Sequence, residues 1–343
     1  MHGHARIAAA LAGCQPDTTP VMLHNFMMAA READMTMRQY RSDPKYTARA
    51  HIEAVERYGY DGILLDIDTA TLACAAGVPV DFPDDEPALC RGALLNSIED
   101  VDQLEPVDLA KHRGVQVWLE AACLLKQHFG GEIWIRGNCD QAPFSLACMV
   151  RGMQGFLLDI TDESSHAYVR KLLDYCAGIT CQFLSLMAGT GVDMLSNGDS
   201  SGGTSLISPR LYRELAQPYQ KRIAAHAHSL GLPWALHVCG KTNAILDDLV
   251  QTGADALELD FKTDAKLARH VLEDRAAFIG NIDPSGVLAL GTPDLVETET
   301  RKLMETFSGT PRFILNAGCA IPAETPSANL AAMIRVAREY RGP

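Results

Sequence analysis

Short apolar runs alternate with longer stretches of helical periodicity along the chain. An apolar run of about four to eight residues, bounded by Gly, Pro or polar residues, is typical of a buried strand, whereas apolar positions three and four apart indicate a helix with one buried face. Runs with the character of strands lie at 19–25, 62–67, 132–137, 192–196, 233–240, 256–259, 276–282 and 312–315. Their alternation with helices predicts a parallel sheet joined by crossover helices.

The segments between these runs predict the helices. An amphipathic helix is expected at the N-terminus, and further helices are expected at 44–58, 143–158, 164–187, 208–230, 243–251, 293–307 and 327–340. The segment 69–131 is too long for a simple crossover. It contains an acidic, Pro-rich turn cluster at 81–87 and an amphipathic stretch at 115–129. We therefore expect an insertion after the second strand, followed by a helix.

Polar residues stand at the C-terminal ends of nearly all the predicted strands. They are His24, Asp68, Arg136, Asn197, Asp199, His237, Cys239, Asp260, Asn281, Asp283, Asn316 and Cys319. A (β/α)8 barrel builds its active site at this end of all its strands, whereas a doubly wound sheet has one binding crevice. Because no linker composition separates the strand–helix units, we predict an α/β fold, a single (β/α)8 TIM barrel over residues 1–343.

Composition and charge exclude several other classes of protein. The 343 residues are 47% hydrophobic and 21% charged, and the formal net charge is -13. A nucleic-acid binder needs clustered Lys and Arg, and a membrane span needs about 20 apolar residues; the sequence shows neither pattern. Arg6 interrupts the N-terminal apolar run, which argues against a signal peptide. Ten cysteines without a regular framework are typical of reduced thiols, so we expect a cytoplasmic protein.

Two strand ends carry residues that suit a metal ion. His237 and Cys239 are two residues apart at the end of one strand, so both side chains point to the same face. Cys319 follows the last predicted strand and, in a narrow barrel interior, can reach the same ion. Nitrogen and thiolate ligands are those that zinc prefers, and a catalytic zinc keeps three protein ligands and one open position. The alternative is a strand end with a buried thiol. We predict that these three residues bind zinc.

Further polar residues are candidates for roles beside this metal. Asp68 and Asp199 are the predicted catalytic residues. Asp68 would orient the substrate or, alternatively, hydrogen-bond the backbone of the rim. Asp199 and Glu258 are candidates for an extra zinc ligand or for the oxygen that accepts the second N–H of His237, but Asp199 could instead brace the Ser- and Gly-rich loop that follows it. Arg136 would pair with an anionic tail of the substrate or with another acid.

Short motifs at the predicted strand ends and helix starts point to a family. They are Gly77-Val78-Pro79-Val80, Ala142-Pro143-Phe144-Ser145-Leu146-Ala147, Leu206-Ile207-Ser208-Pro209-Arg210-Leu211-Tyr212, Pro233 to Gly240, Gly280-Asn281-Ile282-Asp283-Pro284, and Asn316 to Pro322 with Thr325-Pro326. With these motifs the chain resembles the uroporphyrinogen decarboxylase superfamily from about Pro20 to Ala332. The resemblance implies the barrel independently of the strand count.

This superfamily has two chemical branches, and the resemblance to the first is incomplete. The porphyrinogen decarboxylases bind acidic tetrapyrroles without a metal, using two arginines near the N-terminus, where this chain has Asn25 and Ala29. A tyrosine of that branch is replaced by Cys148, and its C-terminal histidine by Cys319. Only the aspartate shared by both branches remains, as Asp68. A substrate with many carboxylates needs such cations, so these losses argue against a decarboxylase.

The second branch contains zinc-dependent methyltransferases, which move a methyl group from a methylated corrinoid protein to a thiol such as coenzyme M. Its signature, His-x-Cys followed much later by Cys, matches His237, Cys239 and Cys319. The resemblance therefore implies a methyltransferase that uses Zn²⁺ to deprotonate a thiol and takes the methyl group from methylcobamide on a partner corrinoid protein. The chain itself lacks an Asp-x-His-x-x-Gly cobalamin-binding pattern.

The sequence leaves the methyl acceptor open. A coenzyme M-like thiol, a homocysteine-like thiol and a pterin are all considered, although a pterin would demand different activation chemistry. Two alternative functions also remain: a decarboxylase-type lyase that has lost the usual arginines, and a non-catalytic partner that binds a corrinoid or a metal. Zinc content and methyl transfer to thiols separate the three.

Overall fold

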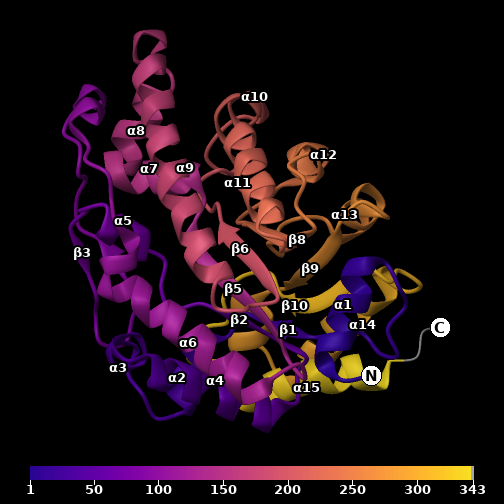
Figure 1. Ribbon diagram of the computed structural model, residues 1–343. Coiled ribbons are helices and arrows are strands. Elements are labelled where there is room, and N and C mark those ends of the chain that lie inside the picture. The colour runs from indigo at the N-terminus through magenta and orange to yellow at the C-terminus, as the bar shows by residue number, and fades with distance from the viewer. Residues whose placement is uncertain (341–343) are drawn as a thin grey trace.

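A ring of eight parallel strands lies at the centre of the computed structural model, which describes residues 1–340 (Figure 1). In ring order the strands are β1 (Met22–Leu23), β2 (Gly62–Leu65), β5 (Trp134–Gln141), β6 (Met194–Gly198), β7 (Trp234–Val238), β8 (Ala256–Leu259), β9 (Ala277–Ile282) and β10 (Phe313–Ala317). A parallel bridge between Val21 and Leu315 joins the first strand to the last. Each predicted strand-like run overlaps one of these strands, although β5, β6 and β10 extend beyond the predicted ends, and the predicted (β/α)8 barrel is confirmed.

The interior of the barrel changes from apolar at its base to polar at its rim. The basal cluster consists of Met22, Trp134, Met194, Ala235, Ala256, Ala277, Ile279 and Ile314. Helix α1 (Gly3–Ala12), the amphipathic N-terminal helix expected from the sequence, packs Ile7 against this cluster, and its Arg6 pairs with Asp61 at 3.0 Å. Because inward positions recur every second residue, the next positions up the strands carry polar groups such as His24, Arg136 and Glu258. The chemistry therefore lies at the C-terminal ends of the strands.

Helices surround the ring of strands (Figure 1). They include α2 (Phe26–Glu32), α3 (Met37–Ser42), α4 (Pro44–Tyr58), α9 (His166–Ala188), α11 (Gln217–Ser229), α12 (Leu246–Val250), α13 (Ala265–Leu272), α14 (Pro293–Thr306) and α15 (Ser327–Glu339). The predicted helix at 143–158 is instead two helices, α7 (Pro143–Arg151) and α8 (Met153–Asp159). Gly152 between them has a φ of 79°, which a right-handed helix does not accommodate.

A second difference concerns the helix predicted at 208–230. It begins with α10 (Pro209–Leu211), whose Ser208 side chain accepts a hydrogen bond from Leu211 N, and passes through a π-helical turn (Tyr212–Ala216) before α11. The Ser-Pro start was therefore predicted correctly, but the periodicity of the sequence did not show the widened turn. Helices α2, α3 and α13 were not predicted.

The expected insertion after β2 is present. It contains α5 (Thr71–Ala75), a small antiparallel pair formed by β3 (Val80–Asp81) and β4 (Leu89–Cys90), two 3₁₀ turns (Ile98–Gln103 and Leu109–Lys111), and α6 (Arg113–Phe129). In Figure 1 the insertion runs along one side of the barrel, beside α7 and α8. Pro87, between β3 and β4, reaches the cavity at the rim. The insertion therefore contributes to one wall of the site.

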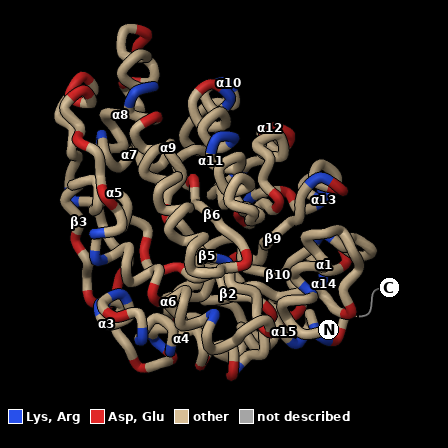
Figure 2. The backbone as a smooth tube through the Cα atoms, in the orientation of Figure 1, with Lys and Arg blue, Asp and Glu red and all other residues tan. Residues whose placement is uncertain are grey.

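Charges of both signs are interspersed over the surface helices (Figure 2). Within residues 1–340, no helix combines the length and the apolar character needed to cross a membrane. The prediction of one domain over 1–343 extends to three residues, 341–343, that lie outside the described part of the chain, and it stays a prediction.

Candidate metal centre and adjoining cavity

Two glycines allow the strand ends that carry the cysteines to bend into the barrel mouth. Strand β7 ends at Val238, Cys239 follows, and Gly240 has a φ of 80°. A Cβ on Gly240 would collide with the side chain of Ser205. After β10, a Cβ on Gly318 would collide with the backbone nitrogen of Phe261. Only glycine fits these two close approaches, and the turns place Cys239 and Cys319 on the same side of the mouth.

His237, Cys239 and Cys319 meet there. Their ligand atoms lie within 4.8 Å of one another: Nε2 of His237 is 3.2 Å from Sγ of Cys239 and 3.7 Å from Sγ of Cys319. Tetrahedral zinc with bonds of about 2.0 Å to nitrogen and about 2.3 Å to sulfur separates such ligand atoms by roughly 3.6 Å. The three residues that the sequence singled out are thus brought together, and their donor set and spacing fit zinc.

These three groups affect one another's ionisation. The hydrogen bond with Cys319, together with the adjacent His237, lowers the pKa of the Cys239 thiol, and the same contact raises the pKa of Cys319. Burial disfavours the charged imidazole of His237, but the Cys239 thiolate and Glu258 together raise its pKa to about 9. A bound metal ion would displace the protons that these groups hold, because histidine and cysteine coordinate metals in their deprotonated forms.

Glu258 lies behind His237 and is fully buried. Its Oε2 accepts a hydrogen bond from Nη2 of Arg136 at 2.7 Å and lies 3.8 Å from Nδ1 of His237, and its Oε1 accepts from Nδ2 of Asn316 at 2.8 Å. Burial opposes ionisation, but Arg136, His237 and His24 outweigh it and lower the pKa of Glu258 to about 2. The carboxylate is therefore charged and faces the ring nitrogen of His237 that points away from the two thiols.

A cavity of about 120 Å³ adjoins the three residues. Its polar lining comes from residues on or just after most of the barrel strands. These residues are His24, Asp66, Asp68, Thr69, Arg136, Asn138, Asp140, Gln141, Ser200, His237, Glu258 and Cys319. His24 contacts Asp66 at 2.7 Å through Nε2. Leu64, Phe26 and Met27 supply apolar surface. Four carboxylates and one arginine thus surround a space that is small beside the ~300–1,000 Å³ of typical ligand pockets.

The family model for uroporphyrinogen decarboxylase (URO-D) matches residues 3–340. The chain belongs to the uroporphyrinogen decarboxylase family. The sequence is 32% identical to the methylcobamide:CoM methyltransferase MtbA of Methanosarcina mazei over 285 residues, which cover 82% of this chain and 81% of that protein. It is also 28% identical to the uroporphyrinogen decarboxylase of Syntrophotalea carbinolica, over 85% of this chain and 83% of that one.

A solved methyltransferase structure from Methanosarcina mazei has the same fold. It superposes with a TM-score of 0.90 at 22% sequence identity and covers 99% of both chains. The resemblance drawn from the sequence motifs is therefore confirmed at the level of the family and its barrel. Relatives of both chemical kinds occur in this family, so the chemistry of this member has to be argued from its site.

The two aspartates predicted to be catalytic lie in different environments. Asp68 lines the cavity, and its Oδ1 accepts hydrogen bonds from Ala70 N and from Thr71 Oγ1, both at 2.9 Å. Burial raises its pKa above the usual range. Asp68 thus lines the cavity and hydrogen-bonds the rim, as one of its two predicted roles requires; its role in orienting a substrate stays a prediction.

Asp199 is fully buried and does not line the cavity. Its Oδ1 accepts from the backbone nitrogen and the hydroxyl of Ser145, and its Oδ2 from Nε2 of Gln220 at 2.7 Å. The backbone nitrogen of Ser201 in turn donates to the Ser145 hydroxyl at 2.9 Å. This network holds the loop after β6 against α7, which is the bracing role considered for Asp199. Glu258, the other candidate, is the acid that faces His237.

Two residues of the cavity were missed from the sequence. Asp140 and Gln141 belong to β5, which was predicted to end at Gly137 but continues to Gln141 with a shift of register after Asn138. The alternation of Arg136, Asn138 and Asp140 could have revealed Asp140, since residues two apart on a strand share a face. Gln141 is out of phase with that alternation and reaches the cavity after the shift of register, which no local pattern shows.

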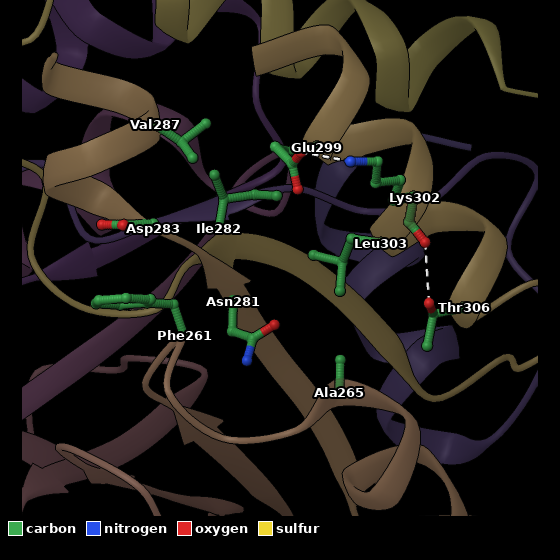
Figure 3. Close-up of a pocket in the computed structure, with 10 residues that line it drawn as sticks. All are labelled: Phe261, Ala265, Asn281, Ile282, Asp283, Val287, Glu299, Lys302, Leu303 and Thr306. Carbon is green, nitrogen blue, oxygen red and sulfur yellow. Dashed lines mark hydrogen bonds and ion pairs between the residues drawn. The ribbon is translucent and has the colours of Figure 1, made fainter. Parts of the chain in front are cut away.

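A separate groove of about 260 Å³ lies between α13 and α14, near the end of β9 (Figure 3). Glu299 and Lys302, which face each other in Figure 3, form an ion pair at 2.6 Å. Asn281 donates to the carbonyls of Asp260 and Thr263, and Asp283 caps the turn that follows it. The residues described along this groove include no histidine or cysteine, and Asn281 and Asp283 shape their loop.

Proposed function

We propose that this protein is a zinc-dependent methyltransferase that moves a methyl group from a methylcobamide, carried on a partner corrinoid protein, to the sulfur of a small thiol. The observation that carries the proposal is the meeting of His237, Cys239 and Cys319 at the edge of a polar cavity. The relatives named as methylcobamide:CoM methyltransferases support it.

The proposed reaction requires the protein to bind and orient a thiolate. In the transfer, a carbon–sulfur bond forms as the cobalt–carbon bond of the methylcobamide breaks; the bonding electron pair stays on cobalt, which is reduced from Co(III) to Co(I), and the thiol proton leaves to solvent. Zinc held by His237, Cys239 and Cys319 would lower the pKa of the acceptor thiol so that it reacts as a thiolate at neutral pH. Oε2 of Glu258 lies 3.8 Å from Nδ1 of His237, where a small shift would let it accept the N–H of a metal-bound imidazole, and Ser200 Oγ lies 3.3 Å from Cys239 Sγ.

The charge of the cavity favours this reaction over porphyrinogen decarboxylation. Arg136 is the sole Lys or Arg among the lining residues, and it is already paired with Glu258, while three further carboxylates line the same space. A tetrapyrrole with many carboxylates would meet a single arginine and several carboxylates there, so repulsion would outweigh attraction. The cavity volume of about 120 Å³ instead suits a small acceptor.

Metal analysis combined with a methyl-transfer assay tests the proposal. The purified protein should contain about one zinc per chain and should demethylate methylcobalamin, followed optically, when a suitable thiol is added. Cys319→Ser should bind zinc at least about tenfold more weakly and lose most of the transfer, because a hydroxyl is a poor replacement for a zinc-binding thiolate. Cys123→Ser is the matched control, since Cys123 is exposed on α6 and is not one of the three candidate ligands.

Each outcome separates the candidate functions. Equal zinc content in wild type and Cys319→Ser would remove Cys319 from the ligand set. Zinc binding without methyl transfer to any thiol would favour the non-catalytic metal-binding alternative. Decarboxylation of a porphyrinogen by protein free of zinc would favour the lyase.

A further inference from the structure

The wall of the cavity formed by the end of β5 carries buried oxygens without partners. Oδ2 of Asp140 accepts a hydrogen bond from Leu72 N at 2.7 Å, and the side chain of Gln141 lies beside the carboxylate, but Oδ1 has no hydrogen-bond partner of good geometry among the described residues. Nε2 of Gln141 donates to the carbonyl of Thr69, and its Oε1 likewise has no partner within residues 1–340. Both side chains line the cavity and are at most 5% exposed. Buried acceptors are nearly always satisfied, so this wall is suited to a ligand that donates hydrogen bonds.

These oxygens lie close to the candidate metal ligands. A Cβ placed on Gly198 would lie 4.0 Å from Oε1 of Gln141 and 4.0 Å from Cδ2 of His237. Oε1 of Gln141 and Cδ2 of His237 are therefore no more than twice that distance apart. A molecule whose sulfur lies at His237 and whose nitrogen is a few bonds away can reach Gln141 without leaving the cavity.

The same wall favours a ligand group that carries a positive charge. Asp140 and Asp68 are both buried, and within the described chain neither forms an ion pair with Lys or Arg; Arg41 acts on Asp68 only from a distance. Burial, reinforced by Asp68, raises the pKa of Asp140 well above its usual range. Asp140 also has a φ of 55°, a conformation that Asn and Asp adopt more readily than most residues. A cation between these carboxylates would stabilise their ionised forms.

Arg136 supplies a positive charge and hydrogen-bond donors to the same cavity. Its Nη2 binds Glu258, but its Nε and Nη1 are buried without partners among residues 1–340, and the side chain lines the cavity. Guanidinium nitrogens in this position suit a carboxylate. The cavity thus presents unsatisfied acceptors and unsatisfied donors beside the thiol-binding residues.

We propose that the methyl acceptor is an α-amino-acid thiol of the homocysteine class. Its ammonium group binds at Asp68, Asp140 and Gln141, its carboxylate binds at Arg136, and its sulfur lies at His237, Cys239 and Cys319. This inference rests on the proposed methyltransferase function and names the substrate class of that same site.

A set of thiols that differ by one group tests the inference. Homocysteine carries both charged groups, 3-aminopropane-1-thiol lacks its carboxylate, and 4-mercaptobutanoate lacks its amine; 2-mercaptoethanesulfonate is a purely anionic thiol. With zinc-loaded wild type and methylcobalamin, homocysteine should have the lowest KM, and both anionic thiols should have a KM at least about tenfold higher than homocysteine, as expected from the loss of a charge-assisted hydrogen bond.

Asp140→Asn assigns the ammonium site. Asparagine keeps an oxygen for Leu72 N and tolerates the positive φ, so the variant should fold. It should raise the KM for homocysteine and for 3-aminopropane-1-thiol by about tenfold while leaving that for 4-mercaptobutanoate within about twofold. Gln141→Met should likewise raise the KM values for homocysteine and 3-aminopropane-1-thiol relative to the KM for 4-mercaptobutanoate. Asp294→Asn, at an exposed position on α14, is the matched control with no change.

A binding measurement that needs no turnover complements the kinetics. Methionine, the product expected from homocysteine, should bind the wild-type protein more tightly than 4-(methylthio)butanoate in calorimetry, and Asp140→Asn should remove the difference. If an anionic thiol proves the best acceptor, or if Asp140→Asn and Gln141→Met leave the ratio of KM values unchanged, the amino-acid class is wrong while the methyltransferase function stands. If no thiol is methylated by zinc-loaded protein, the proposed function itself fails, and this inference with it.

Discussion

Replacing Glu258 by Gln tests whether this acid orients His237, the candidate zinc ligand, or only neutralises a buried arginine. The side chain is fully buried, bonds Arg136 at 2.7 Å and Asn316 at 2.8 Å, and lies 3.8 Å from Nδ1 of His237. Glutamine has nearly the same shape, so the substitution removes the charge with little change in packing.

Two effects of different origin are expected. Breaking a buried ion pair by removing one partner leaves the other charge uncompensated, which destabilises a protein by about 3–5 kcal/mol. Loss of the oxygen that a metal-bound histidine faces weakens metal binding about 10- to 100-fold. Glu258→Gln should therefore lower the free energy of unfolding by about 3–5 kcal/mol and raise the dissociation constant for zinc by about 10- to 100-fold.

The double variant Glu258→Gln/Arg136→Met separates these effects, because it removes both charges. Urea unfolding of zinc-free protein should show that much of the lost stability returns, whereas competition with a chromogenic chelator should show that zinc binding stays weak. Glu163→Gln, at an exposed position, is the control for loss of one carboxylate. If the double variant binds zinc as tightly as wild type, Glu258 acts on the metal centre only through Arg136, and the orienting role is refuted.

Two further predictions concern buried groups away from the metal. Burial lowers the pKa of His51 from 6.5 to about 3, so between these pH values His51 is protonated in the unfolded chain and neutral in the folded chain. Stability should therefore be lost as pH falls from about 6.5 towards 3. In urea titrations, His51→Gln should reduce the difference in unfolding free energy between pH 7.5 and pH 5 by about 2 kcal/mol. Asp199→Ala leaves the hydrogen-bond donors of Ser145 and Gln220 unsatisfied, so it should destabilise the protein by about 2–4 kcal/mol. The zinc content of the variant, measured after refolding with excess zinc, should stay near that of wild type. Complete loss of zinc would instead indicate a direct role of Asp199 at the metal.

The eight strands followed from local patterns in the sequence, whereas the joining of Cys319 to His237 and Cys239 also rested on the narrow barrel interior and on the family resemblance. Apolar runs of strand length marked the barrel, and the spacing of His237 and Cys239 fixed their common face whatever the partner strands. Other features depend on three-dimensional arrangement. His237 lies opposite Glu258 because β7 and β8 pair in that register, and no local pattern distinguished Glu258 from Asp199 as the partner of His237.

Breaks inside regular elements were the other source of error. Gly152 interrupts a helical periodicity that the sequence continues on both sides, and a glycine within such a pattern is often tolerated. At β5 the opposite occurred: Gly137 was taken as the end of a strand that continues through a shift of register to Gln141. Both residues of the missed wall, Asp140 and Gln141, lie beyond that glycine.

In the proposed mechanism, the arrangement of the ring separates the activation of the thiol from the recognition of its other groups. Of the candidate zinc ligands, His237 lies on β7, Cys239 follows it, and Cys319 follows β10, with Glu258 on β8 between them. Asp68 instead follows β2, and Asp140 belongs to its neighbour β5. Because these two pairs of strands lie on different sides of the barrel mouth, charges at the ends of β2 and β5 can change without moving the metal ligands. If the proposed function holds, members of the family that share the three candidate zinc ligands should differ in acceptor according to the residues at Asp140 and Gln141. Exchanging the charge there should alter acceptor preference more than zinc affinity.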